Sequence, residues 1–134
     1  MASYSDAPPV ILDTNILIYS AAEPYDIEFT LRKKGVFFIK VPSFVIRELE
    51  YLCSGKRTKA SKLAKLALQI ALRFEVMHVQ VEGRDVDEKV LNLAKRHGYA
   101  VATADTMLRR RLMDAQVPVI YFKDGRLVTE DLSL

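Results

Sequence analysis

Four carboxylates of this sequence lie among residues that are mostly apolar. Asp13 and Asp105 each end a run of mostly apolar residues. Glu48 and Asp87 fall on the apolar faces of predicted helices. Because an unpaired buried carboxylate is costly, such a group is normally paired, protonated or bound to a cation. Four acids from four segments predict a site for a hard divalent ion, Mg²⁺ or Mn²⁺ rather than zinc, and such an ion promotes phosphodiester hydrolysis by activating water.

Helical spacing separates two of these acids from the acids around them. At about 100° per residue, Glu48 falls between Phe44 and Leu52 on the apolar arc of its helix. Asp87 falls beside Leu91 in another helix, whereas the glutamate that follows it lies on the polar side. Both side chains are therefore expected to point toward the interior.

Helix capping is the alternative explanation for three of the four acids. Asp13 and Asp105 each precede a predicted helix, and Asp87 lies in a first helical turn, where the peptide dipoles favour an anion. Capping does not account for Glu48 in the middle of its helix, nor for an aspartate at the ends of two strands. Acids with perturbed pKa values cluster at functional sites, so a shared site is the favoured interpretation.

Short apolar runs alternate with amphipathic segments along the chain. The runs predict strands at 10–13, 36–41, 76–81, 99–103 and 117–122, and Asp124-Gly125 predicts a tight turn after the last of them. The amphipathic segments predict helices at 15–22, 26–34, 44–53, 60–74, 86–97 and 106–115, with Ser43 as the N-cap of the third.

This alternation predicts an α/β fold, namely a three-layer α/β/α arrangement with a mainly parallel central sheet of about five strands. Ligands of such sheets bind beyond the carboxyl ends of the strands. Asp13 and Asp105 both stand at such ends, so they meet only if the first and fourth strands are neighbours.

Length and composition favour one domain over residues 1–134. No apolar stretch approaches the roughly 20 residues that span a bilayer, and the first residues do not resemble a signal peptide. The single cysteine, Cys53, excludes an internal disulfide and a cysteine-based zinc site. We therefore expect a cytoplasmic protein without a membrane partner.

The net charge of +3 comes from 20 basic and 17 acidic residues. If four acids gather in one cleft, 13 acidic groups remain elsewhere against the 20 basic ones. A basic exterior around an acidic pocket suits a polyanionic substrate. A mildly basic soluble protein of another kind has the same net charge, so charge alone leaves this open.

The order of motifs over residues 9–122 resembles the PIN-domain family of metal-dependent ribonucleases. The matching stretches are Val-Ile-Leu-Asp-Thr-Asn at 10–15, Pro-Ser-Phe-Val-Ile-Arg-Glu-Leu at 42–49, Asp-Glu-Lys-Val-Leu at 87–91, and Val-Ala-Thr-Ala-Asp at 101–105 followed by Leu-Arg-Arg-Arg-Leu at 108–112. Within the family, the pattern looks most like the archaeal branch related to ribosomal-RNA-processing nucleases, with the VapC toxins as the neighbouring possibility.

The resemblance implies the roles of several residues and the partners. The catalytic and metal-binding acids would be Asp13, Glu48, Asp87 and Asp105, with Asn15 and Thr103 as supporting polar residues. Some relatives carry a further acid shortly after the fourth, but residues 106–108 are Thr-Met-Leu, which leaves one or two metal ions open. The implied substrate is single-stranded RNA, the implied partner is an antitoxin or a ribosome-assembly factor, and the implied oligomer is a homodimer.

Substrate contacts are expected from basic side chains. Arg109 follows Asp105 by one helical turn and is the best candidate for a phosphate clamp. Lys56, Arg57 and Lys59 form a basic connection that could contact the RNA backbone, although a solvated charge run is the commoner explanation of such a pattern.

Other classes of protein fit the sequence less well. A haloacid-type phosphatase needs a second aspartate where this chain has Asn15, and a receiver domain needs an acidic pair beside a strand end. A Rossmann nucleotide binder needs a glycine-rich first turn, and residues 13–20 contain no glycine. The remaining alternative is a catalytically inactive PIN scaffold that binds RNA or a protein partner, against which four intact acids argue.

Overall fold

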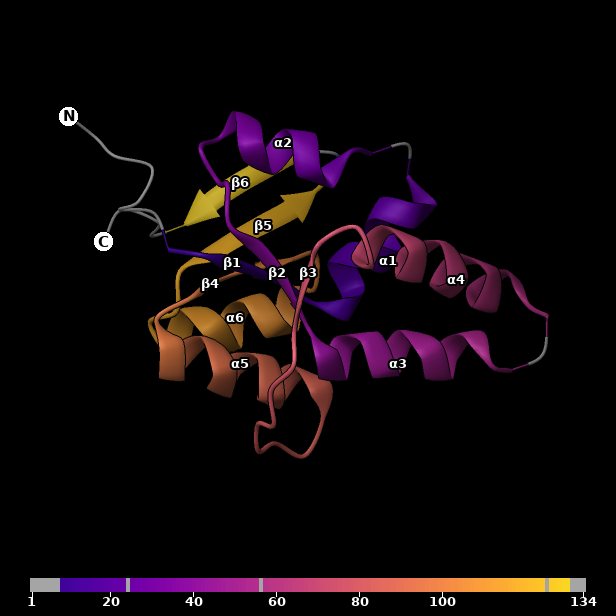
Figure 1. The fold of residues 1–134 in the computed structure, drawn as a ribbon. Helices are drawn as coiled ribbons and strands as arrows, with labels where there is room; N and C mark the ends of the chain where they lie inside the picture. Colours follow the sequence, from indigo (N-terminus) through magenta and orange to yellow (C-terminus); the bar gives the residue numbers. More distant parts are fainter. Residues whose placement is uncertain (1–7, 24, 56, 125, 131–134) are drawn as a thin grey trace.

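Two fully buried strands, β1 and β4, lie side by side at the centre of a six-stranded sheet with the order β3-β2-β1-β4-β5-β6 (Figure 1). The computed structural model describes residues 8–23, 25–55, 57–124 and 126–130. The strands are β1 (Val10–Leu12), β2 (Ile39–Pro42), β3 (Glu75–Met77), β4 (Ala100–Thr103), β5 (Val119–Lys123) and β6 (Arg126–Glu130). Leu12 pairs with Ala102 in a parallel register, so β1 and β4 end at the same edge. The first and fourth strands are therefore neighbours, which is the condition for Asp13 and Asp105 to meet.

Five of the strands are parallel, as predicted, and the sixth adds an antiparallel edge. β6 pairs with β5 so that Lys123 stands opposite Arg126, and the chain therefore reverses between them. Asp124 has a φ of 52° at this reversal, while Gly125 lies outside the described residues. With β6 the sheet has one strand more than the roughly five that were predicted.

The described residues form six helices: α1 (Thr14–Ala22), α2 (Ile27–Lys33), α3 (Ser43–Cys53), α4 (Lys59–Ala71), α5 (Val86–His97) and α6 (Thr106–Asp114). In Figure 1, α2 lies on one side of the sheet and α5 and α6 lie on the other, while α3 and α4 form a hairpin that projects beside it. Helices on both sides explain why the central strands are buried along their whole length and, apart from Thr103, apolar. The three-layer α/β/α fold is confirmed. Within the described part of the chain, none of the helices is long and apolar enough to span a membrane.

The prediction that Ser43 caps α3 is wrong. Pro42 occupies the cap position without a side-chain hydrogen bond, and Ser43 is the first helical residue. The Ser43 hydroxyl is engaged elsewhere, since it accepts from the Val79 N–H at 3.3 Å and lies 3.4 Å from the Val79 carbonyl oxygen, to which it donates. Ser43 therefore joins the start of α3 to the chain that leaves β3.

β3 is shorter than the predicted strand at 76–81. Its hydrogen-bonded neighbour is β2, which ends at Pro42 opposite Met77 because α3 begins at the next residue. Residues 78–81 consequently have no strand to pair with. The chain instead crosses from β3 to α5 as an irregular segment whose backbone is held by side chains of α3 and α5.

Candidate active site

Asp13 stands directly beyond β1 and is almost completely buried, with 1% of its surface exposed. Its Oδ1 accepts from the Ile16 N–H at 2.7 Å, which makes Asp13 the N-cap of α1. Its Oδ2 accepts from the Thr103 hydroxyl at 2.6 Å. One oxygen thus fixes the helix start and the other joins β1 to β4.

Asp105 stands two residues beyond β4 and is half-buried. Its Oδ1 accepts from the N–H groups of Met107 and Leu108 at 2.8 and 3.1 Å, so Asp105 caps α6. Its Oδ2 accepts from Asn15 Nδ2 at 2.9 Å. In each aspartate Oδ1 caps the helix that follows. The Oδ2 of Asp13 bonds to Thr103 of β4, and the Oδ2 of Asp105 bonds to Asn15 of α1.

The two residues that were expected to support the acids both hydrogen-bond to them. Thr103 is fully buried and accepts from the Asp105 N–H at 3.0 Å while it donates to Asp13. Asn15 is exposed and donates to Asp105. These bonds connect the chain after β1 with the chain after β4, so the carboxyl ends of the two central strands form one polar site.

Burial raises the pKa of Asp13 from 3.8 to about 7, although the Thr103 and Ile16 hydrogen bonds oppose the shift. The negative charges of Asp87 and Asp105 raise it further. A buried carboxylate that holds its proton near neutral pH is in an environment that a cation would relieve. A bound cation would therefore stabilise the ionised form of the Asp13 carboxyl group, whose pKa burial raises to about 7.

Burial also raises the pKa of Asp87, which is half-buried in the first turn of α5. The charges of Asp105, Asp85 and Glu48 raise it further, whereas Arg111 lowers it. Asp87 thus experiences the field of acids from α3 and from the chain after β4. We call Asp13, Glu48, Asp87 and Asp105 the acidic cluster, because each of them interacts electrostatically with at least one other member.

The donor chemistry of the acidic cluster fits a hard cation, because every donor is a carboxylate oxygen, and burial together with mutual repulsion raises the pKa values of Asp13 and Asp87. The carboxylates of the described residues are not yet arranged around one point. Among residues 8–23, 25–55, 57–124 and 126–130, no three Asp, Glu, His or Cys side chains lie close enough together to hold an ion as they stand. Ligation would require the carboxylates to draw together, which the half-buried Glu48 and Asp87 can do more easily than Asp13.

Arg109, the expected phosphate clamp, packs against β5. Its guanidinium lies 4.5 Å from the centre of the Tyr121 ring, and the Tyr121 hydroxyl is 2.9 Å from the hydroxyl of Thr106. Arg111, which the sequence did not single out, is the arginine of α6 that faces the acids: it lies 4.0 Å from Glu88 and lowers the pKa of Asp87. Its position depends on how α6 packs against α5, which helical periodicity alone does not give.

Of the three residues of the predicted basic connection, Arg57 lies between two helices and Lys59 lies within a helix. Lys56 lies outside the described residues, and Arg57 is exposed between α3 and α4. Lys59 is the first residue of α4, which Thr58 and Ser61 begin with a reciprocal capping box. Arg57 and Lys59 lie between α3 and the first turn of α4, at one end of the helical hairpin (Figure 1). A contact of the three basic residues with RNA stays a prediction.

Replacing Thr103 by Val should lower the free energy of unfolding by about 1–3 kcal/mol, because it leaves Asp13 Oδ2 and the Asp105 N–H without this partner in a buried site. Thr103→Ser keeps the hydroxyl and is the matched control, expected to lose only about 1 kcal/mol for one methyl group. Urea unfolding of the metal-free protein at pH 8 measures both. Equal stability of Thr103→Val and wild type would show that the hydroxyl does not hold the two strand ends.

Comparisons with known proteins agree with this architecture. A family model described as "PIN like domain" matches residues 10–125. Ribonuclease VapC9 of Archaeoglobus fulgidus is 31% identical over 122 residues, which cover 91% of this chain and 88% of the relative. The solved structure of the PIN domain endonuclease Utp24 is similar with a TM-score of 0.76 at 24% identity, covering 97% of this chain and 96% of that one. A domain of a functionally unknown protein from Methanocaldococcus jannaschii is similar with a TM-score of 0.67 at 16% identity, covering 96% and 98%. The chain therefore belongs to the PIN-domain family.

Proposed function

We propose that this protein is a metal-dependent endoribonuclease that hydrolyses phosphodiester bonds of single-stranded RNA. The observation that carries the proposal is the pair of aspartates at the adjacent ends of β1 and β4, joined by crosswise hydrogen bonds and subject to the field of Asp87. A likeness to a curated ribonuclease over most of the chain supports RNA as the substrate.

The acidic cluster would hold Mg²⁺ or Mn²⁺, with Asp13 and Asp105 as the most rigid ligands because their second oxygens are fixed by Thr103 and Asn15. When bound, such an ion supplies an activated water and offsets charge on the phosphoryl oxygens. The chain itself supplies carboxylates that can accept the proton of the attacking water. Arg111, next to Asp87, supplies a positive charge at the border of the cluster.

The cellular role that we propose is either that of a VapC-type toxin with an antitoxin partner or that of a nuclease in ribosomal-RNA processing with a ribosome-assembly partner. The relative named VapC9 supports the first. We further propose a homodimer located in the cytoplasm. Exposed apolar side chains on the α3–α4 hairpin, Tyr51, Leu52 and Leu66, support a partner surface there.

Incubation of the purified protein with a labelled single-stranded RNA tests the proposal. We expect internal cleavage with Mn²⁺ or Mg²⁺, no cleavage in EDTA, and slow or absent cleavage of the same sequence in a duplex. Restoration of activity when Mn²⁺ is added back to the EDTA-treated sample is the control for irreversible damage. RNA binding without cleavage under every ion condition would instead identify a scaffold that does not cut.

A further inference from the structure

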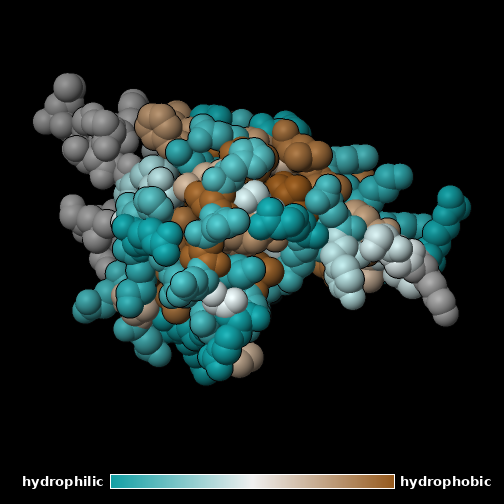
Figure 2. Space-filling model, turned by 60° about the horizontal axis from the view of Figure 1, so that its bottom comes forward, coloured by the Kyte–Doolittle hydropathy of each residue, from teal (hydrophilic) through white to brown (hydrophobic). Residues whose placement is uncertain are grey.

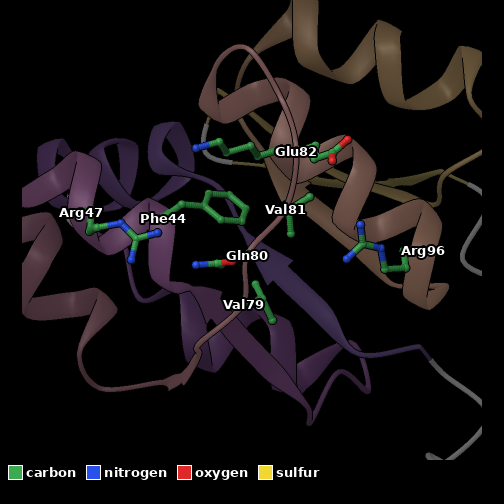
Figure 3. Close-up of a pocket in the computed structure, with 8 residues that line it drawn as sticks. Phe44, Arg47, Val79, Gln80, Val81, Glu82 and Arg96 are labelled. Carbon is green, nitrogen blue, oxygen red and sulfur yellow. The ribbon is translucent and has the colours of Figure 1, made fainter.

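A pocket of about 460 Å³ lies between α3, α5 and the irregular segment 79–82. Figure 3 shows Arg47 of α3 and Arg96 of α5 on either side of this segment, with Gln80 between them. Lys89 of α5 also lines the pocket. We call this the basic pocket, because three of its lining residues are cationic and only Glu82 is acidic.

The cations of the basic pocket lack acidic partners. In the part of the chain that the structure describes, neither Arg47, Lys89 nor Arg96 forms an ion pair. Two other arginines do form ion pairs. The Glu88 carboxylate oxygen Oε2 lies 3.0 Å from Nε of Arg84 and 4.0 Å from Nη2 of Arg111. Three cations gathered around one hollow, against a single acid in its lining, create a positive potential that favours an anionic ligand.

Side-chain contacts hold the wall of the basic pocket in place. Ser43 bonds to both backbone groups of Val79, and Asn92 donates to the Glu82 carbonyl oxygen at 2.8 Å. At Gly83 the chain runs so close to α5 that an added Cβ would lie 2.8 Å from the backbone nitrogen of Lys89. The segment that separates Arg47 from Arg96 is therefore fixed at both ends.

Lys89 is held at this wall as well. Its ammonium nitrogen lies 5.9 Å from the centre of the ring of Phe44, which is 4% exposed. Such an arrangement is an attractive contact between a cation and an aromatic face. The alkyl chain of Lys89 passes close to Gly83, where an added Cβ would lie 2.8 Å from Lys89 Cγ.

The basic pocket and the acidic cluster share the same two helices. Arg47 precedes Glu48 in α3, and Lys89 follows Asp87 by two residues in α5. At about 100° per residue, each cation points to a different side of its helix from the neighbouring acid. A polyanionic strand whose phosphate reaches the acids can therefore continue across these helices into the basic pocket.

We propose that the basic pocket binds a backbone phosphate of the RNA strand beside the bond that the acidic cluster would cleave. This inference rests on the proposed function. Guanidinium groups bind phosphate oxygens with two parallel hydrogen bonds, and the pocket offers two of them from opposite walls. In Figure 2, which turns the bottom of the molecule forward, hydrophilic residues cover much of this face and surround several hydrophobic patches.

The double variant Arg47→Gln/Arg96→Gln tests the basic pocket by RNA binding in EDTA, where cleavage is absent. We expect the dissociation constant for a labelled single-stranded RNA to rise about tenfold or more. Loss of one phosphate contact lowers the salt dependence of log Kd by about 0.7 for single strands, so the double variant should show a slope smaller by about that amount. Arg126→Gln, an exposed arginine on β6 at the opposite edge of the sheet, is the matched control and should bind like wild type.

Glu82→Gln provides a variant with the opposite expected effect. It removes the acid from the lining, so RNA should bind several-fold more tightly and with a steeper salt dependence. Tighter binding cannot result from partial unfolding. Unchanged or weaker binding by Glu82→Gln would contradict the proposal.

Cleavage and binding together separate this inference from the proposed function. If wild type cleaves RNA and Arg47→Gln/Arg96→Gln binds it as tightly as wild type, the basic pocket is not a phosphate site. If wild type never cleaves but the double variant still loses affinity, the proposed nuclease activity fails and the phosphate site stands. Urea unfolding of each variant verifies that the fold is unchanged.

Discussion

Asp13→Asn is expected to lower the rate of metal-dependent RNA cleavage by about a thousandfold, because it removes the charge of the central ligand and with it several kcal/mol of transition-state stabilisation. The substitution preserves shape. Asparagine can still accept the Ile16 N–H that begins α1, and its amide can donate to the Thr103 hydroxyl oxygen. Cleavage rates of the two proteins at saturating Mn²⁺ measure the effect.

Asp26→Asn is the matched control for this loss. Asp26 also caps a helix, since its carboxylate accepts from the Phe29 N–H at 2.9 Å at the start of α2, but it is exposed and outside the acidic cluster. It should cleave RNA at the wild-type rate. Equal cleavage by wild type and Asp13→Asn would mean that the site is wrong or that a contaminating nuclease supplies the activity.

The centre of the fold could be predicted because local and long-range signals agree there. Residues 10–12 and 100–102 are uniformly apolar and buried, and a parallel sheet brings the carboxyl ends of their strands to one edge. The types of Asp13 and Asp105 then indicated a polar site at that edge. Their hydrogen bonds to Thr103 and Asn15 show how closely the two ends are joined.

Features that depend on contacts between elements could not be predicted in the same way. Ser43 has the residue type of a helix cap, but its hydroxyl bonds to Val79 because α3 begins where β2 ends. Arg111 faces Asp87 only because α6 packs beside α5. The basic pocket has the same origin: Arg47 and Arg96 are far apart in sequence, and no local pattern indicates that they line one hollow.

The metal-free protein should lose stability as the pH rises from about 4 to about 7. The pKa of Asp13 is about 7 in the folded chain against an ordinary value of 3.8, so the folded state binds a proton that the unfolded state has released across this interval. The free energy of unfolding therefore falls with rising pH and levels off above about pH 7. A difference of about three pKa units corresponds to about 4 kcal/mol. Burial raises the pKa of Asp87 as well, which adds to the loss in the same direction.

Urea unfolding in EDTA at pH 4.5 and at pH 8 measures the loss of unfolding free energy with rising pH. Comparison with Asp13→Asn gives the share of this loss that comes from the titration of Asp13. The variant has no titrating group at this position, so it should lose much less stability than wild type and be the more stable protein at pH 8. Mn²⁺ binds the ionised carboxylate of the folded state, so it should raise the melting temperature of wild type at pH 8 and have little effect on Asp13→Asn. Parallel pH profiles for the two proteins would show that Asp13 does not hold its proton in the fold. An absent response of wild type to Mn²⁺ would show that the acidic cluster does not bind the ion.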